Sequence, residues 1–248
     1  MRQLLSVLML MTRSTLHKIL LILAAMAAVQ SSLFFFVLHN AMERYTETSL
    51  ISTRLDFLFS ESRLILFFGL AFLLTTAVLV LIPCDLKGRQ SYTWKRLSVP
   101  ERGIFFRRAF YNSCCYFLLW GIQLILVLGL SAVYLKVQIP DAVDTQTVML
   151  AFYRNEFLHS LLPLADVQNL IRNFILCVGL GFAAAVFPLR LRKRKPGLEI
   201  LCLVPLSLIF FRSEMGDMGS SMVLGMMSLL VILLSVRFIY RKEDTDEA

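Results

Sequence analysis

Very few side chains in this sequence are placed where they could do covalent chemistry. The three histidines, His17, His39 and His159, are scattered and none lies clearly deep in an apolar stretch, so none is suited to act as a base for an intramembrane serine. The sequence also lacks a GxxxxGKS or GxxxxGKT phosphate-binding loop and an HExxH zinc motif. No two of its cysteines have the CxxC spacing of a metal or redox site: Cys84, Cys114, Cys115, Cys177 and Cys202. We therefore predict no catalytic, cofactor-binding or metal-binding residues, and expect that the chain is not by itself an enzyme.

Polar residues inside apolar stretches are the candidates for ligand binding. Arg172 lies about 8 Å beyond the start of its stretch, at about 1.5 Å per residue, and an ionisable residue at that depth suggests a functional contact. It could bind an anionic lipid headgroup or a peptide carboxylate. Alternatively, its long side chain extends to the outer membrane surface, with or without an acidic partner from the preceding loop. Gln30 and Gln123 also lie where polar side chains usually face other helices, and we predict all three residues as contacts for substrate or lipid.

A second pattern, between Ser98 and Phe110, is suited to transmitting force. Ser98 and Glu101 have the three-residue spacing of a capping box, and Pro100 stands in the first turn, where its missing N–H is not needed. Apolar residues are then interleaved with arginines: Arg102, Ile104, Phe105, Phe106, Arg107, Arg108 and Phe110. The pattern predicts a short amphipathic helix at the membrane surface that continues directly into a membrane helix. The alternative is a well-capped membrane helix with ordinary basic flanks.

The composition places these residues in a membrane protein. Of the 248 residues, 58% are hydrophobic and 17% are charged, whereas soluble domains have about 45–50% apolar and about 25% charged residues. The mean hydropathy is +0.72. The first long apolar run, 19–38, is long enough to span a membrane and is followed by no clear cleavage site, which indicates a retained helix and not a signal peptide. We predict a single all-α transmembrane domain over residues 1–248.

Six stretches approach the roughly 20 residues that a membrane-spanning helix needs. An apolar segment at 1–13 precedes them and is predicted to be an interfacial helix, unless it simply lengthens the first span. Four spans remain the alternative count, if the fourth and fifth stretches do not cross separately. The mixed loops at 40–63 and 138–166 are apolar enough to predict surface helices, with one or two in the second loop. The predicted spans are 18–39, 64–83, 109–137, 167–189, 198–212 and 221–240.

The distribution of basic residues predicts the orientation. With the N-terminus inside and six spans, 18 of the 25 lysines and arginines lie on cytoplasmic segments, in agreement with the positive-inside rule. Both termini are therefore predicted to be cytoplasmic, in a bacterial plasma membrane. The basic run at 190–195 acts as a topology signal or binds anionic lipid, and nucleic-acid binding is disfavoured because the run lacks interleaved aromatics. Glu199 is predicted to pair locally or with a lysine at the lipid surface.

This layout resembles the membrane subunit of an ABC-2 type ABC transporter. An interfacial segment precedes the first span, as the elbow helix does in that family, and the largest cytoplasmic loop lies between spans two and three. In that loop the segment RLSVPERGIFF, residues 96–106, resembles the one at which the family's coupling helix begins. One feature departs from the family pattern. The loop between spans five and six, where the family commonly has re-entrant helices, is only 213–220, and the larger outer loop lies between spans three and four.

The resemblance implies a permease that is energised by a separate ATPase subunit, in which ATP and magnesium would be bound. It also implies pairing with a second copy or a related permease, contacts with membrane lipids, and export of a hydrophobic peptide or a lipid-like substrate. The ATPase would dock on a coupling helix at 97–106, through Leu97, Ser98, Val99, Glu101, Arg102, Ile104 and Phe105. The competing hypothesis is a non-transporting assembly or sensor subunit of a larger membrane complex.

Overall fold

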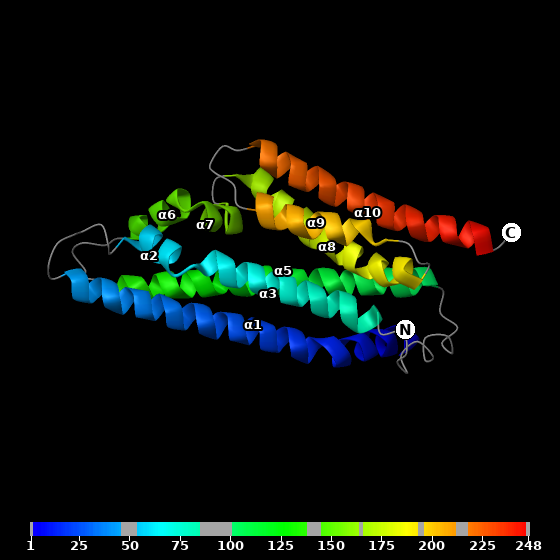
Figure 1. Cartoon of the computed structure of the whole chain (residues 1–248), viewed down its shortest axis with the longest axis horizontal. Coiled ribbons are helices and arrows are strands. Elements are labelled where there is room, and N and C mark those ends of the chain that lie inside the picture. Colours follow the sequence, from blue (N-terminus) through cyan, green and yellow to red (C-terminus); the bar gives the residue numbers. More distant parts are fainter. Residues whose placement is uncertain are drawn as a thin grey trace.

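The chain folds as a bundle of long helices, seen from the side in Figure 1. The computed structural model describes residues 2–45, 54–84, 101–137, 145–163, 166–192, 196–211 and 218–246, and every regular element in these ranges is helical. The long helices are α1 (Arg2–Tyr45), α3 (Leu64–Leu81), α5 (Glu101–Val137), α8 (Val167–Arg192) and α10 (Met218–Asp246). The shorter elements are α2 (Leu55–Glu61), the 3-10 turn η1 (Ile82–Cys84), α6 (Thr145–Arg154), α7 (Glu156–Leu161) and α9 (Leu198–Phe210).

Within the described ranges, five helices are long and apolar enough to cross a membrane, which indicates a multi-pass membrane protein. Their candidate spans are Thr15–Glu43, Leu64–Cys84, Arg102–Val137, Val167–Leu191 and Met218–Arg241. The apolar helix α9 has only 13 residues. That is about 20 Å of helix, shorter than a hydrocarbon core of about 30 Å. The predicted count of six spans, with the fifth at 198–212, is therefore not confirmed by helix length and composition.

Helices α8 and α10 run parallel to each other. Near their first turns, Arg172 of α8 donates a hydrogen bond to Ser221 of α10. Near their other ends, Val186 of α8 and Ile239 of α10 belong to one buried cluster. In Figure 1 the N- and C-termini of the chain lie at the same end of the bundle, and we refer to it below as the terminal end.

Helix α9 runs antiparallel to α8 and α10. At its start, Glu199 forms an ion pair with Arg190 from the last turn of α8. Just beyond its end, the Phe211 ring lies beside Arg172 from the first turns of α8. Helix α9 therefore returns the chain from the terminal end of the bundle to the opposite end, where α10 begins (Figure 1).

Helix α1 is a single uninterrupted helix of 44 residues. Thr15 Oγ1 and Tyr111 Oη are hydrogen-bonded at 2.7 Å, which joins α1 to α5. Further along, Gln30 Nε2 donates to the backbone oxygen of Leu64 at 3.1 Å, which joins α1 to α3. Helix α1 begins at Arg2, whereas the candidate membrane span within it begins at Thr15. Residues 2–13 are therefore continuous with the helix that contains the first span, and their interfacial placement stays a prediction.

Helices α5 and α8 share the most extensive contact in the bundle. They approach so closely at Gly181 that a Cβ atom there would lie 2.0 Å from Ser113 Oγ and 2.7 Å from the Ser113 backbone nitrogen. Asn112 Nδ2 donates to the Gly181 backbone oxygen at 3.4 Å beside this contact. On the α10 side, a Cβ on Gly179 would lie 3.1 Å from Ser228 Cβ. Small residues on α8 thus allow it to pack tightly between α5 and α10.

Three short helices cover the end of the bundle opposite the termini (Figure 1). The prediction of helices in both mixed loops is confirmed, with α2 in the first loop and α6 and α7 in the second. Asn155 Oδ1 accepts hydrogen bonds from the backbone N–H groups of Phe157 and Leu158 at 3.1 and 3.3 Å, and so caps α7. The apolar residues of these helices are buried in a common cluster with α1, α3 and α5, which includes Leu55, Leu58, Phe59, Ala151, Phe152, Phe157, Leu158 and Leu161.

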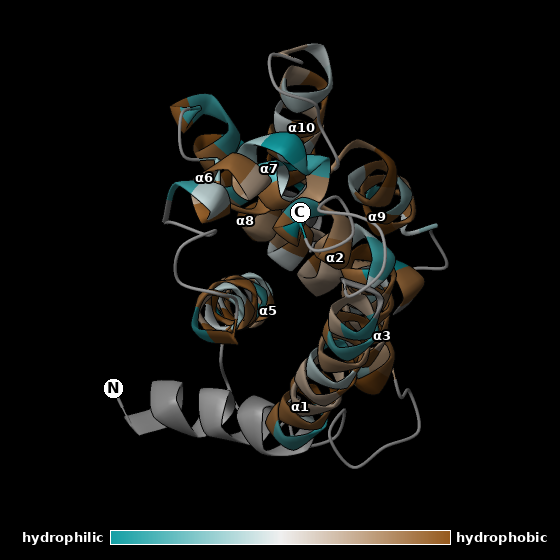
Figure 2. Cartoon of the chain, turned by 90° about the vertical axis from the view of Figure 1, so that its left-hand side faces the viewer, coloured by the Kyte–Doolittle hydropathy of each residue, from teal (hydrophilic) through white to brown (hydrophobic). Residues whose placement is uncertain are grey.

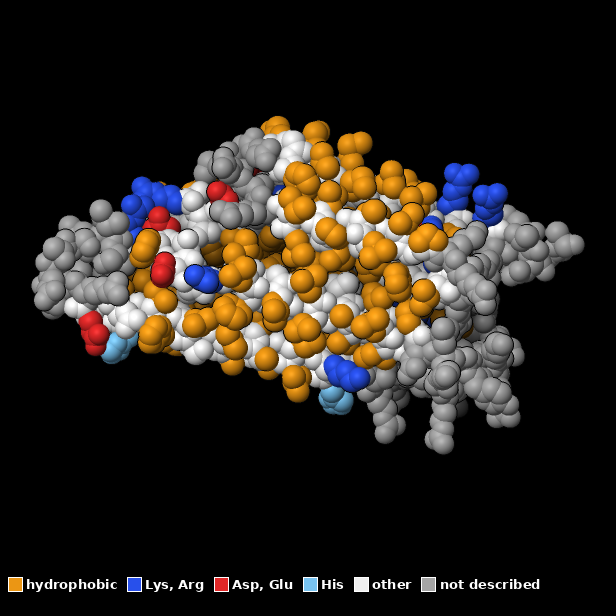
Figure 3. All heavy atoms as spheres, in the orientation of Figure 1, with side chains coloured by type: hydrophobic (Ala, Val, Ile, Leu, Met, Phe, Trp, Pro, Cys, Tyr) orange, Lys and Arg blue, Asp and Glu red, His pale blue; other side chains and the backbone are white. Residues whose placement is uncertain are grey.

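The middle of the bundle presents an apolar surface. Figure 3 shows hydrophobic side chains across the middle of the visible face and charged side chains near its ends. Figure 2, viewed from the end that carries α2, α6 and α7, shows hydrophilic segments on α6 and α7 in front of mostly hydrophobic long helices. On α10, Met222, Met226 and Leu233 are among the exposed side chains. A continuous apolar surface of this kind is typical of contact with a membrane.

Candidate functional site

Arg172, which the sequence singled out as a ligand contact, is buried inside the bundle with only 2% of the residue exposed. Its Nε and Nη2 atoms donate to Asn173 Oδ1 at 3.2 and 3.0 Å, and its Nη1 atom donates to Ser221 Oγ at 2.9 Å. The alternative that this side chain extends to the outer membrane surface is therefore wrong, because neighbouring polar side chains hold the guanidinium group within the protein.

The buried arginine belongs to a polar network that joins α7, α8 and α10. Ser221 Oγ donates to Asn169 Oδ1 at 2.5 Å, and Asn173 Nδ2 donates to the backbone oxygen of Ser160 at 2.7 Å. The guanidinium carbon of the arginine lies 5.7 Å from the centre of the Phe211 ring, within the range of a cation–π contact. A satisfied buried network of this kind rigidifies the helices that it joins.

Gln30 and Gln123, the other two predicted ligand contacts, are fully buried. Gln30 bonds to α3 as described above, in agreement with the prediction that polar residues in the spans face other helices. Both side-chain amide atoms of Gln123 lack a hydrogen-bond partner in the described part of the chain. Neither residue, nor Arg172, lines the two cavities described below. The structure therefore does not bring the three predicted residues together in one site.

The predicted coupling helix falls only partly within the described residues. Leu97, Ser98 and Val99 lie outside them. Helix α5 begins at Glu101 and continues without a break to Val137. This continuity fits both interpretations of the sequence, a surface helix that runs directly into a membrane span and a membrane helix with basic flanks.

The first turns of α5 contact the C-terminal part of α10. The Arg102 guanidinium carbon lies 4.4 Å from the centre of the Tyr240 ring. Phe105 is only 1% exposed and packs against Val186 and Ile239, whereas Ile104 is partly exposed. Of the predicted partner contacts, Phe105 is thus occupied by contacts within the chain, because the helix turns its side chain toward α8 and α10. A partner could reach Arg102 and Ile104 without disturbing that packing.

The predicted local pairing of Glu199 is confirmed, because its carboxylate forms an ion pair with Arg190. The side chain of Glu199 is 4% exposed, and the Arg190 guanidinium carbon lies 5.0 Å from the centre of the Phe238 ring. The pair therefore connects α8, α9 and α10 near the terminal end, while the Arg172 network connects α7, α8 and α10 near the other end.

An apolar cavity of about 70 Å³ lies among α3, α5, α7, α8 and α9. It can hold roughly five to seven water-sized groups, at about 10–15 Å³ each. A Cβ atom on Gly69 would meet only Leu208 Cδ2, at 3.6 Å, so the glycine leaves space open between α3 and α9. Leu208 is among the exposed apolar side chains, so this side of the cavity reaches the apolar surface of the bundle. The lining is Ile65, Phe68, Gly69, Phe72, Tyr116, Leu119, Trp120, Phe157, Asn173, Leu176, Cys177, Leu180, Ser207, Leu208 and Phe211.

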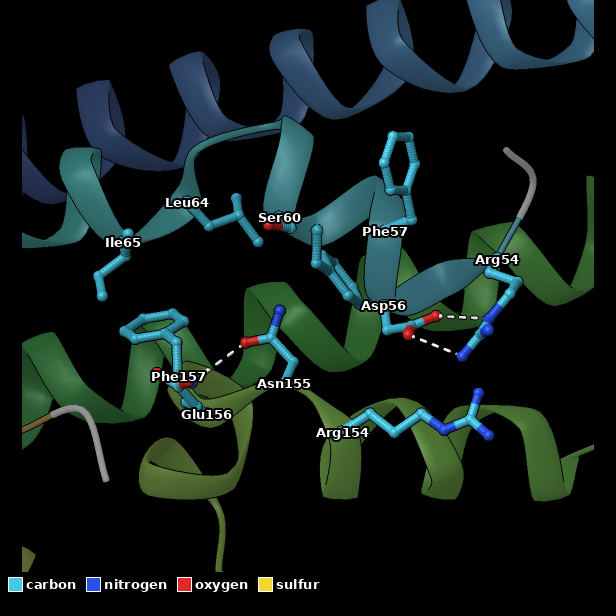
Figure 4. Close-up of a pocket in the computed structure, with 11 residues that line it drawn as sticks. Arg54, Asp56, Phe57, Ser60, Leu64, Ile65, Arg154, Asn155, Glu156 and Phe157 are labelled. Carbon is cyan, nitrogen blue, oxygen red and sulfur yellow. Dashed lines mark hydrogen bonds and ion pairs between the residues drawn. The ribbon is translucent and has the colours of Figure 1, made fainter. Parts of the chain in front are cut away.

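A larger polar pocket, of about 400 Å³, lies between α2 and the junction of α6 and α7. Arg54, which precedes α2, donates to the Asp56 carboxylate at 3.2 and 3.0 Å. Figure 4 shows the side chains of Arg54 and Arg154 at the same side of the pocket, with Asn155 and Glu156 across the junction. In the described part of the chain, Arg154 makes no hydrogen bond or ion pair. The pocket therefore presents one arginine that is paired and one that is open to a ligand.

The polar pocket and the apolar cavity share a wall, because Ile65 and Phe157 line both. The Phe157 ring centre lies 5.5 Å from that of Phe68 and 6.3 Å from that of Phe211, and Phe68 and Phe211 lie 5.8 Å apart. Three aromatic rings thus stand where the two cavities meet. Sequence reasoning missed this site, since Arg54 and Arg154 are distant in the chain. The signal that the sequence did offer was the mixture of charged and apolar residues in the loops at 40–63 and 138–166.

Comparisons of the chain with protein-family models, with curated proteins and with solved structures give no match. Among the described residues, no three His, Cys, Asp or Glu side chains come together where they could hold a metal ion. The functional argument below therefore depends on the sequence pattern and on the geometry of the bundle.

Proposed function

We propose that this chain is the membrane-spanning permease subunit of an ATP-driven transporter, with a hydrophobic peptide or a lipid-like molecule as its substrate. ATP and magnesium would be bound in a separate ATPase subunit that docks on residues 97–106, which include the first turns of α5. A second copy of the chain, or a related permease, would complete the transporter. The resemblance of the layout to ABC-2 permeases motivates the proposal, and the course of α5 is the structural observation that supports it.

Helix α5 connects the proposed docking site with the far end of the bundle. It has 37 residues, or about 55 Å of helix. It contacts α8 and α10 through Phe105 and α1 through Tyr111. Further along, Trp120 Nε1 donates to the backbone oxygen of Leu161 in α7 at 3.0 Å. A displacement of the first turn of α5 would therefore be passed to four other helices, including one that lines both cavities.

The proposal includes six crossings, with both termini in the cytoplasm of a bacterial cell. Although α9 is short, it returns the chain from the terminal end to the far end, and so serves as the fifth crossing. This arrangement places most of the lysines and arginines on the cytoplasmic side, as the positive-inside rule requires.

Cysteine labelling will test this topology. In a background without the native cysteines, we expect Thr145→Cys to react with a membrane-impermeant maleimide on intact cells. We expect Lys193→Cys to react only after the cells are permeabilised, because the proposed topology places position 145 outside the cell and position 193 in the cytoplasm. A cytoplasmic cysteine-bearing fusion protein serves as the control for leakage. Labelling of both positions from the same side would rule out the six-crossing arrangement.

Association with the ATPase will test the proposed docking site. We expect the double substitution Glu101→Arg with Arg102→Glu to reduce copurification of the ATPase at least tenfold, which corresponds to about 1.4 kcal/mol of lost binding energy. Reversing both charges leaves the net charge unchanged and spares the buried Phe105. The measurement is the ratio of ATPase to permease in complexes purified from membranes.

The matched control is Arg237→Glu, which reverses an exposed charge on α10 near the same end of the bundle. It should leave the ratio unchanged. Undiminished ATPase association in the double variant would remove the coupling hypothesis. The absence of any ATPase in complexes of the unmodified chain would instead favour a non-transporting assembly or sensor subunit.

A further inference from the structure

The polar pocket and the apolar cavity together have the shape and chemistry of a site for one amphiphilic molecule. They meet at Ile65 and Phe157. The polar pocket lies beside the charged ends of α2 and α6, and the apolar cavity follows α3 from Ile65 to Phe72, about 10 Å of helix. A molecule that fills both would therefore need a charged headgroup that is joined directly to a hydrocarbon tail.

The apolar cavity is suited to part of a hydrocarbon chain. Its lining is formed by aromatic and aliphatic side chains, and the polar groups that reach it have partners of their own: Asn173 donates to Ser160, Ser207 donates to Val204, and Trp120 donates to Leu161. A polar ligand would therefore find few free hydrogen-bonding groups in this cavity. A hydrocarbon chain would need no hydrogen-bonding groups there.

The polar pocket is suited to a phosphate group that is accompanied by an amine. Its lining contains two guanidinium groups, Arg54 and Arg154, and two carboxylates, Asp56 and Glu156. Arg54 is neutralised by Asp56, so Arg154 is the group available to a phosphate, which arginine binds well through its planar set of donors. Because the lining carries equal numbers of positive and negative groups, a headgroup with both charges fits it better than one with a net negative charge.

We infer that the polar pocket and the apolar cavity bind one phospholipid with a zwitterionic phosphoethanolamine headgroup, taken from the membrane leaflet at the end opposite the termini. Arg154 contacts the phosphate, the Glu156 carboxylate across the junction contacts the amine, and one acyl chain passes the three aromatic rings into the cavity beside Gly69. Binding does not require transport. Only the further step, that this lipid is the cargo, rests on the proposed function.

Photocrosslinking of the purified full-length chain will test this inference. The chain is placed in phosphatidylglycerol nanodiscs that contain a trace of phosphatidylethanolamine with a diazirine on one acyl chain, or of phosphatidylglycerol with the same labelled chain. We expect the phosphatidylethanolamine probe to label residues 65–72 and 207–211 preferentially. The Arg154→Gln variant should reduce this labelling about tenfold, the usual effect of losing one charge-assisted hydrogen bond. The control Lys136→Gln, an exposed cation outside the pocket, should not change it.

A second variant tests the cavity itself. Gly69→Leu should fill the space between α3 and α9 and abolish labelling there, while the bundle stays folded because the glycine has only one neighbouring side-chain atom within contact distance. The control Gly129→Leu adds the same side chain where a Cβ meets nothing within 4 Å, and should leave the labelling unchanged.

Three results would overturn the inference. Even labelling of all lipid-facing helices would indicate only the lipids that surround the bundle, and unchanged labelling of Arg154→Gln would exclude the phosphate contact. Equal labelling by the phosphatidylglycerol probe would exclude the zwitterionic headgroup. Because no ATPase is present, these results are independent of the docking experiment, which tests the permease proposal alone.

Discussion

Replacing Gly181 with alanine is expected to lower the free energy of unfolding by about 1–3 kcal/mol, the usual cost of overpacking a tight interior. The added Cβ would lie 2.0 Å from Ser113 Oγ, 2.7 Å from the Ser113 nitrogen and 2.9 Å from the Ala109 oxygen. Two of these three atoms belong to the backbone of α5, so a change of side-chain rotamer cannot relieve the contact. Helices α5 and α8 must move apart, which weakens the most extensive contact in the bundle.

Thermal unfolding in detergent, followed by the loss of monodisperse protein on size exclusion, will measure this effect. For a chain of this length, a loss of 1–3 kcal/mol corresponds to a fall in Tm of roughly 2–12 °C. The control Gly129→Ala places the same methyl group where it meets nothing within 4 Å, and should keep or raise the Tm. Adding Ser113→Ala to Gly181→Ala should restore little stability, because the backbone contacts remain. An unchanged Tm for Gly181→Ala would show that α5 and α8 are not packed this closely.

Replacing Arg172 with methionine is expected to destabilise the chain by about 2–4 kcal/mol. Methionine fills a similar volume but donates no hydrogen bonds, so Asn173 Oδ1 and Ser221 Oγ lose the guanidinium donors that they now have. Each buried polar atom left without its partner costs about 1–3 kcal/mol. Arg172→Lys should also be destabilising, because a single ammonium group cannot reproduce the two parallel bonds to Asn173 together with the bond to Ser221.

The same unfolding measurement applies to these variants, with Lys136→Gln as a control that removes an exposed cation and should shift stability by no more than about 0.5 kcal/mol. The double variant Arg172→Met with Asn173→Leu should recover part of the loss, since it removes an unsatisfied acceptor together with its former donor. If Arg172→Met had a Tm equal to that of the unmodified chain, the hydrogen bonds of Arg172 would not be what holds α8 and α10 together.

The sequence was sufficient to predict the five long apolar helices and the short helices of the two mixed loops. Long apolar runs predicted the long helices. The mixed loops predicted α2, α6 and α7, because the apolar residues of a charged segment are expected to be buried against the rest of the protein. A local ion pair of Glu199 was predictable as well, since the basic run at 190–195 lies close to it in the sequence, but the structure was needed to identify Arg190 as the partner.

Which faces of the helices meet could not be predicted. A membrane helix is apolar on all sides, so periodicity does not mark the buried face as it does in a soluble protein. The burial of Phe105, the close approach at Gly181 and the inward direction of Arg172 all depend on how helices pack against one another. The polar pocket was missed for a related reason: Arg54 and Arg154 come together only because α2 and α6 fold over the same end of the bundle.

The shortness of α9 has a consequence for the bilayer itself. If α9 crosses the membrane, its roughly 20 Å of helix face a hydrocarbon layer of about 30 Å, and the lipids beside it must compress to match. Helix α9 forms one side of the apolar cavity, so the hydrophobic mismatch is greatest beside this cavity. Thicker bilayers should therefore increase the strain at this position and drive neighbouring lipids, or a second copy of the chain, to shield it.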